Sequence, residues 1–264
     1  MCSVRNPRPP FMPLLTLFRV AKRFDSDRKT GGLEAIRRLD LAVKPGEFVS
    51  LVGPSGCGKS TALRIIAGLL QPTEGAVAFP GGRPEIGFVF QEPTLMPWAD
   101  ALGNVRLPLE LKGVARGEAE ARAARALERV GLKGFEKSFP RELSGGMKMR
   151  VSIARALAAG PKLLLMDEPF AALDELTRQA LNDDLLKLWR EDKLTVLFVT
   201  HSVFESTYLS TRVVVMRPRP GRVHDEIVLS PPAERSEAWR MTAEFAGEAA
   251  RVSAALKHAM EEGE

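Results

Sequence analysis

Residues 53–61, GPSGCGKST, constrain the fold of this 264-residue chain more than any other stretch. They match the pattern G-x-x-x-x-G-K-[ST] in full and follow an apolar run, FVSLV, that predicts a buried strand. In such a loop the glycines let backbone N–H groups converge on phosphate oxygens, and the following helix N-terminus adds partial positive charge. The sequence therefore predicts a strand, a phosphate-binding loop and a helix from Lys59 to about Leu69.

Every position of this loop is a candidate nucleotide contact: Gly53, Pro54, Ser55, Gly56, Cys57, Gly58, Lys59, Ser60 and Thr61. Lys59 is expected to reach the β- and γ-phosphates, Ser60 to ligate Mg²⁺, and Thr61 to hydrogen-bond phosphate. Cys57 lies near the helix N-terminus, which predicts a lowered thiol pKa and ready reaction with thiol reagents. The alternative is that Cys57 is an inert, small space-filling residue.

A second motif, LLLMDEP at residues 163–169, supplies acidic partners for the loop. Its apolar residues predict a buried strand whose end carries Asp167 and Glu168. We expect Asp167 to hold Mg²⁺ and Glu168 to polarise an attacking water as general base. The alternative is a surface turn with two solvated acids. The two motifs together predict a P-loop nucleoside triphosphatase.

The rest of the chain alternates between strand and helix patterns. Further strands are predicted at 14–24, 33–43, 75–79, 85–90, 162–167, 194–200, 212–217 and 222–229. Helices are predicted at 117–131, after Gly146 and at 175–189. The order strand, helix, strand favours a parallel sheet with right-handed crossovers. The tail from Ala233 has partly helical apolar spacing, typical of a docked or partner-binding helix.

Composition narrows the class of protein. The net charge of +5 is spread over scattered basic residues and does not call for nucleic-acid binding. The sequence holds two cysteines, without metal-ligand spacing, which favours a reduced cytoplasmic protein. No stretch approaches the ~20 apolar residues of a membrane span. We expect residues 1–12 to be a disordered lead-in, 13–232 the nucleotide-binding unit, and 233–264 a helical tail.

Several further motifs occur in one order along the chain: Gln91 in VFQEPTLMPW, ELSGGMKMR at 142–150, FAALD ending at Asp174, and FVTHS with His201. With the two motifs above, this order resembles the ATP-binding subunit of ABC transporters over roughly residues 14–230. The resemblance implies an α/β fold with a P-loop NTPase (RecA-like) core, an antiparallel β subdomain and an inserted α-helical subdomain at about 92–160.

The resemblance also implies site roles and partners. ATP would bind with Mg²⁺ between two copies arranged head to tail, with Ser144, Gly145 and Gly146 of one copy touching the ATP of the other. Gln91, Asp174 and His201 would line the same nucleotide. Gln91 would also approach the metal, and His201 would bond the γ-phosphate or water. Phe24 occupies the place of an adenine-stacking aromatic; the alternative is a core strand residue.

Three stretches are similar to the nitrate/sulfonate/taurine importer group: TLMPWADALGNVRLPLEL, LSGGM with Met147, and HSVFESTYLSTRVVVMRPRPGR. This similarity implies uptake of a small solute (nitrate, sulfonate, taurine, bicarbonate or pyrimidine-precursor class) through a membrane permease served by a periplasmic or extracellular solute-binding protein. The chain would lie on the cytoplasmic face of the inner (plasma) membrane. HSVFES departs from the commoner H-D-x-x-E-A, so any role of that Asp does not carry over.

Two other functions are disfavoured by the residues. A soluble ABC ATPase of DNA repair or translation usually carries long coiled-coil insertions or two cassettes, whereas this sequence has one cassette and no such insertion. A P-loop kinase outside the family does not fit LSGGM or the ordered pair Gln91 and His201. Leu95, Met96 and Trp98 allow two interpretations. They form either an exposed apolar patch that docks a permease helix or part of the packing of the helical subdomain.

Overall fold

The computed structural model describes residues 12–25 and 32–261. A six-stranded sheet has the order β5-β6-β7-β3-β8-β9. Its strands are β3 (Phe48–Val52), β5 (Ile86–Val89), β6 (Leu163–Asp167), β7 (Thr195–Thr200), β8 (Arg212–Arg217) and β9 (Arg222–Val228). The first five in spatial order are parallel, as predicted, and only the edge strand β9 runs antiparallel. Every residue of β3, β6 and β7 is buried, which explains their continuous apolar runs.

A second, three-stranded sheet is antiparallel and has the order β2-β1-β4. It consists of β1 (Leu15–Phe24), β2 (Leu33–Val43) and β4 (Glu74–Ala78). Its inner face contributes Leu15, Leu17 and Ile36 to a core cluster shared with the large sheet. The antiparallel β subdomain implied by the family resemblance is therefore present.

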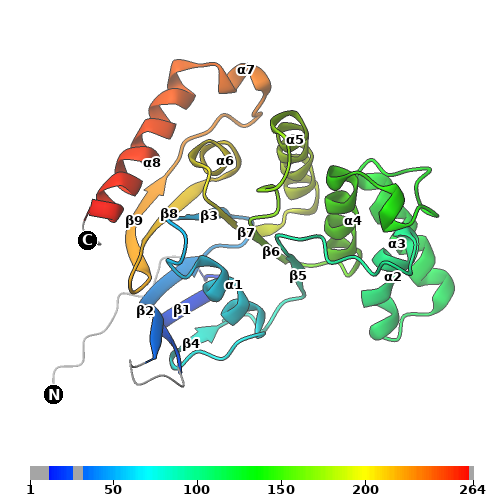
Figure 1. The fold of residues 1–264 in the computed structure, drawn as a ribbon, viewed down its shortest axis with the longest axis horizontal. Coiled ribbons are helices and arrows are strands. Elements are labelled where there is room, and N and C mark those ends of the chain that lie inside the picture. The colour runs from blue at the N-terminus through cyan, green and yellow to red at the C-terminus, as the bar shows by residue number, and fades with distance from the viewer. Residues whose placement is uncertain (1–11, 26–31, 262–264) are drawn as a thin grey trace.

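Helices cover both faces of the large sheet (Figure 1). Along β3, Val49 and Leu51 pack with α1 (Lys59–Ala67) on one face. On the other face Phe48 packs with the cluster that holds α5 (Glu175–Asp192). This division follows from the alternation of side chains along a strand. A short helix, α6 (Val203–Leu209), which was not predicted, follows β7.

Three helices project from the sheet as an arm (Figure 1). They are α2 (Ala101–Leu111), α3 (Arg116–Arg129) and α4 (Gly145–Ala158), with a 3₁₀ turn at Pro140–Glu142. Asp100 caps α2 by accepting a hydrogen bond from the Gly103 N–H, and Ser144 caps α4 by accepting one from the Met147 N–H. Leu127, predicted to lie on an apolar face, is buried between these helices.

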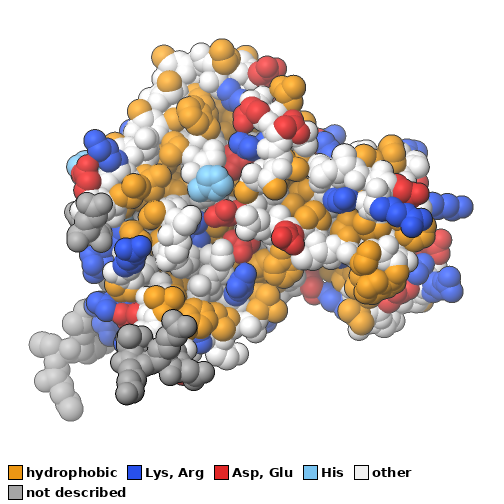
Figure 2. All heavy atoms as spheres, viewed as in Figure 1, with side chains coloured by type: hydrophobic (Ala, Val, Ile, Leu, Met, Phe, Trp, Pro, Cys, Tyr) orange, Lys and Arg blue, Asp and Glu red, His pale blue; other side chains and the backbone are white. Residues whose placement is uncertain are grey.

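The tail forms α7 (Glu237–Arg240) and α8 (Ala243–Glu261). Val252 and Ala259 of α8 pack on Val213 and Val215 of β8, so the tail is a docked helix. The predicted disordered lead-in, apart from Met12, lies outside the described residues. Within 12–25 and 32–261 no helix has the length and apolarity of a membrane span. Figure 2 shows basic and acidic side chains interspersed on the face drawn.

Candidate active site

Four strands of the large sheet bring the motif residues to one edge. Val52 of β3 is level with Thr200 of β7, and Val199 of β7 is level with Asp167 of β6. Parallel strands have their carboxyl ends at the same edge of the sheet. Four segments follow strand ends on that edge: the phosphate loop after β3, Asp167–Glu168 at the end of β6, His201 after β7 and the Gln91 segment after β5. In open α/β sheets this is where ligands bind.

The phosphate loop is closed around the ammonium group of Lys59. Its Nζ donates to the carbonyl oxygens of Gly53 (2.7 Å) and Pro54 (3.1 Å) and lies 4.0 Å from Glu168 Oε1. Gly58, just before α1, has φ 91°, a left-handed conformation that a Cβ disfavours. Ser55 and Gly56 are exposed at the loop tip, and Thr61 lies in the first turn of α1.

Cys57 points away from the loop opening, which overturns the reactive-thiol prediction. Its side chain is fully buried and packs in the cluster that contains Ile36 and Leu63. Burial raises the pKa of the thiol, and the nearby Lys59 ammonium only partly opposes this effect. Loss of water around a buried thiol disfavours the thiolate, and this effect is the largest influence on the pKa of Cys57. The Cys57 side chain is therefore not available to contact a nucleotide in this structure.

Ser60 and Asp167 meet across the site. The Ser60 hydroxyl donates to Asp167 Oδ1 at 2.6 Å, and burial raises the pKa of that carboxyl, with the Ser60 hydrogen bond opposing. A hydroxyl and a carboxylate are the hard oxygen donors that Mg²⁺ prefers, usually with water and phosphate oxygens completing the shell. A buried carboxylate also gains from a nearby cation. The donor set therefore fits a magnesium ion.

Glu168 and His201 face each other beside Lys59. His201 Nδ1 lies 3.4 Å from Glu168 Oε2. Glu168 has φ 46°, and its N–H donates to the Val199 carbonyl at 3.0 Å. A non-glycine residue in this region costs about 1–3 kcal/mol, and such strain is concentrated at functional sites. The backbone thus holds one carboxylate in a fixed direction at the strand end.

Gln91 follows β5 and is exposed. Sequence reasoning missed the residue that fixes its segment. Arg155 of α4 donates to the carbonyls of Pro93 (2.7 Å) and Thr94 (2.9 Å), so the arm and the Gln91 segment are tied together. The sequence pattern does not predict this tie, because Arg155 and the Gln91 segment are far apart along the chain and meet only where α4 crosses the segment.

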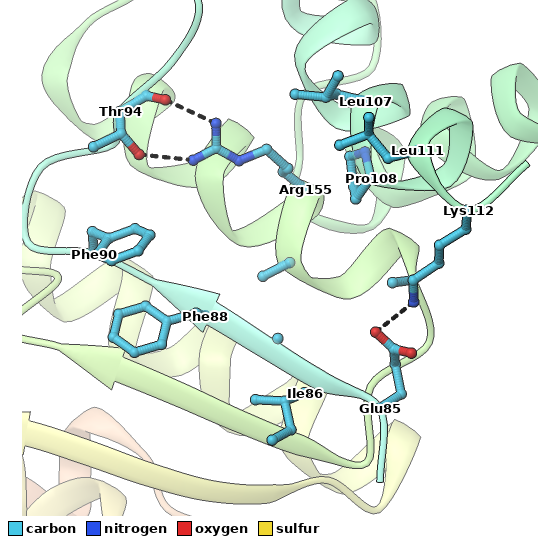
Figure 3. Close-up of a pocket in the computed structure, with 13 residues that line it drawn as sticks. Glu85, Ile86, Phe88, Phe90, Thr94, Leu107, Pro108, Leu111, Lys112 and Arg155 are labelled. Carbon is cyan, nitrogen blue, oxygen red and sulfur yellow. Dashed lines mark hydrogen bonds and ion pairs between the residues drawn. The ribbon is translucent and has the colours of Figure 1, made fainter. Parts of the chain in front are cut away.

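Beside this tie lies a groove of about 340 Å³ between β5 and the arm (Figure 3). Phe88 and Phe90 line one wall, and Leu107 and Leu111 line the other. Of the proposed apolar patch, Trp98 is 76% exposed, whereas Leu95 packs against the core. Trp98 therefore fits the interpretation as an exposed docking patch, whereas Leu95 fits the interpretation as packing of the helical subdomain.

Ser144, Gly145 and Gly146 form the first turn of α4 and its cap, on the arm. Ser144 and Gly145 are exposed, whereas Gly146 packs against Thr177 of α5. Asp174 caps α5, accepting from the Thr177 N–H at 2.9 Å, and this hydrogen bond lowers the pKa of its carboxyl. The structure thus places the Asp174 segment beside the turn that is expected to touch a partner's nucleotide.

Phe24 ends β1 and is 38% exposed, with the Lys22 ammonium 5.2 Å from its ring centroid. The core interpretation of this residue is therefore wrong, and Lys22 lies over one face of its partly exposed ring.

Sequence reasoning also missed Glu205. This buried carboxyl of α6 receives a hydrogen bond from the Thr200 hydroxyl at 2.5 Å, directly before His201. Ser202 caps α6 by accepting from the Glu205 N–H. The pattern S-x-x-E at 202–205 is a helix-start signature that could have revealed both residues.

Comparison with known proteins agrees with this geometry. A family model described as ABC transporter matches residues 36–171. An uncharacterized ABC transporter ATP-binding protein of Methanocaldococcus jannaschii is 51% identical over 211 residues, 77% of this chain and 79% of that protein. The aliphatic sulfonates import ATP-binding protein SsuB of Bacillus cereus (strain ZK / E33L) is 43% identical over 223 residues, 83% and 87% of the two chains.

Among solved structures, a dimeric post-hydrolysis state of the ATP-binding cassette MJ0796 bound to ADP and Pi superposes with a TM-score of 0.73 and 36% identity. It covers 83% of this chain and all of that one. Fold, motif order and sequence identity therefore agree: the chain belongs to the ABC transporter family, as an ATP-binding subunit with ATPase activity.

Proposed function

We propose that this ATPase drives uptake of a small solute, of the nitrate, sulfonate, taurine, bicarbonate or pyrimidine-precursor class, through a partner permease. The observation that carries the proposal is the meeting of Lys59, the Ser60–Asp167 pair and the Glu168–His201 pair at one sheet edge. The similarity to a sulfonate import protein supports the importer assignment.

Each nucleotide is held by two copies of the chain. Lys59 and the loop amides bind phosphates from one copy, and Phe24 stacks on adenine. Ser144, Gly145, Gly146 and Asp174 of the second copy complete the site; in support, the first turns of α4 and α5 lie in contact. Binding then favours the closed dimer, because the phosphates interact with both faces.

Ser60, Asp167 and Gln91 would hold a magnesium ion, which when bound would neutralise charge that develops on the phosphate. Glu168 accepts a proton from the attacking water, and its fixed backbone keeps that carboxylate aimed at one point. His201 contacts Glu168 from the neighbouring strand end and donates a hydrogen bond towards the γ-phosphate or water. Loss of the γ-phosphate removes the contact shared by both copies, and the dimer opens.

The permease docks in the groove of Figure 3. The groove has apolar walls, and Arg155 ties its floor to the segment that begins at Gln91. A helix of the permease inserted there can therefore move with the Gln91 segment. In this proposal the chain lies on the cytoplasmic face of the inner (plasma) membrane, and a periplasmic or extracellular solute-binding protein delivers the cargo.

The variant Glu168→Gln tests the mechanism. It retains the shape of the side chain but removes the base, so we expect hydrolysis to fall by about 10²–10⁴-fold. ATP should then hold the protein as a dimer in size-exclusion chromatography. Glu120→Gln, the same exchange at an exposed site on α3, serves as control. Normal hydrolysis by a monomeric Glu168→Gln protein would refute the role of Glu168.

A further inference from the structure

Behind the active site, an ion pair between half-buried Arg178 and buried Glu205 joins α5 to α6. Arg178 Nε lies 3.8 Å from Glu205 Oε1, and the Glu205 side chain is 9% exposed. Neither atom has a hydrogen-bond partner among the described residues. None of the roles above uses these two side chains, although an incompletely paired buried charge is costly.

On the α5 side, Arg178 holds the backbone that leads into Asp174. Its Nη2 donates to the Leu173 carbonyl at 2.8 Å, and its Nη1 contacts the exposed Glu175 carboxylate at 3.1 Å. The guanidinium therefore fixes the residue directly before Asp174. A lysine would keep the charge here but could not make the forked contact.

On the α6 side, Glu205 holds the backbone that leads into His201. It accepts a hydrogen bond from the Thr200 hydroxyl, and the same hydroxyl oxygen accepts a hydrogen bond from the Ser202 N–H at 3.0 Å. These two bonds bracket His201 on both sides. Burial raises the pKa of the Glu205 carboxyl, while Thr200 and Arg178 oppose that rise.

We propose that Arg178 and Glu205 are positioning residues that couple the segment before Asp174 to the histidine loop. The chain of contacts runs from the Leu173 carbonyl through Arg178 and Glu205 to Thr200, next to His201. A displacement of Asp174 against a second copy is thereby transmitted to His201 of the same copy. The inference rests on the proposed roles of Asp174 and His201.

The site leaves space for such a movement. A pocket of about 280 Å³ lies beside the pair and is lined by both side chains. Closing the gap between Arg178 Nε and Glu205 Oε1 would give both atoms a charge-assisted hydrogen bond at once.

A double-mutant cycle tests this coupling. Glu205→Gln keeps an acceptor for Thr200 but removes the charge, and Arg178→Lys removes the fork to Leu173. Because misplacing a catalytic group by about 1 Å can cost as much as 10²-fold, we expect each variant to lower kcat at least about tenfold. KM for ATP should change less than about twofold, since the phosphate loop is untouched. The double variant should be no slower than the slower single variant.

Lys187→Ala, on the exposed face of the same helix, is the matched control and should keep normal kcat. Unfolding in urea separates coupling from stability: a purely structural pair would lower the free energy of unfolding and leave kcat per folded molecule unchanged. That result, or additive effects on kcat, would overturn the inference.

His201→Ala is measured in parallel. If it hydrolyses ATP normally, the proposed role of His201 fails; if it is inactive while the cycle is additive, only the coupling fails.

Discussion

Cys57 sits in a loop whose backbone is open to solvent, yet its side chain lies in the core. Ser55 and Gly56 before it are exposed, whereas Cys57 belongs to the same core cluster as Ile36 and Leu63. Two influences on its pKa therefore compete: desolvation raises it and the Lys59 ammonium lowers it. Desolvation is the larger, so the protonated, unreactive thiol predominates at neutral pH.

We predict that Cys57 of the folded protein resists thiol reagents. With Cys2 replaced by Ser, modification at neutral pH should be at least about 100-fold slower than in urea, because reaction requires local opening. Absorbance of the released thiol anion follows the reaction. Rapid modification of the folded protein that Mg-ATP prevents would instead restore the interpretation of Cys57 as a reactive residue.

At this scale the sequence located the motif residues but not the directions of their side chains. Lys59, Ser60, Asp167, Glu168 and His201 could be brought to one edge because parallel strands share it. The direction of Cys57 depends on Ile36, a residue of a different sheet, so no local pattern reveals it. Glu205 was missed because an acidic residue on a short amphipathic stretch is usually solvated.

Among the elements, the contact between α4 and α5 depends on a missing side chain. A Cβ on Gly146 would lie 2.6 Å from Thr177 Cγ2, whereas one on Gly145 would meet Leu173 Cδ2 at an ordinary 3.6 Å. Two adjacent glycines thus differ in function: one permits close approach of two helices, and the other leaves a backbone exposed. The double glycine in the sequence gave no sign of this division.

We predict that Gly146→Ala destabilises the protein by about 1–3 kcal/mol through overpacking at this contact. Thr177→Ser removes the clashing methyl but keeps the hydroxyl, so it should restore most of the loss in the same chain. Gly145→Ala is the matched control and should leave the free energy of unfolding unchanged or slightly raised. Urea denaturation measures all four proteins. Failure of Thr177→Ser to rescue Gly146→Ala would show that the contact does not limit stability.

Element prediction succeeded where burial is continuous and failed where tertiary contacts decide. The buried runs at β3, β6 and β7 were recognised because most of their residues are apolar. The antiparallel direction of β9 was not, since a strand pattern carries no direction. The short α6 was overlooked because its seven residues contain little helical periodicity and are stabilised by their cap and by burial.

At the scale of the whole molecule, the tail packs on the chain's own sheet, whereas the junction between the sheet and the arm leaves a groove open. The tail buries Trp239 and Phe245 against Tyr208, so the chain's own tail covers these aromatic side chains. The opposite junction, between β5 and the arm, is left open and lined by apolar side chains (Figure 3). Trp98 and Leu111, 76% and 79% exposed, lie on segments that border this junction. An open apolar groove beside the Gln91 segment therefore suits a partner helix.

We predict that Trp98→Asp weakens association with the permease and stops solute uptake while basal ATPase activity stays normal. An exposed side chain contributes little to folding, so the free energy of unfolding should change by no more than about 0.5 kcal/mol. Loss of an aromatic anchor typically costs at least about 2 kcal/mol of binding, roughly 30-fold in affinity. Co-purification with the permease and uptake by reconstituted vesicles measure the two effects.

Met241→Asp is the control. Met241 is an apolar residue of the tail and is 85% exposed, so this variant should keep both permease association and solute uptake. A Trp98→Asp protein that misfolds and loses ATPase activity would show that Trp98 packs within the arm, and the docking surface would have to be sought elsewhere.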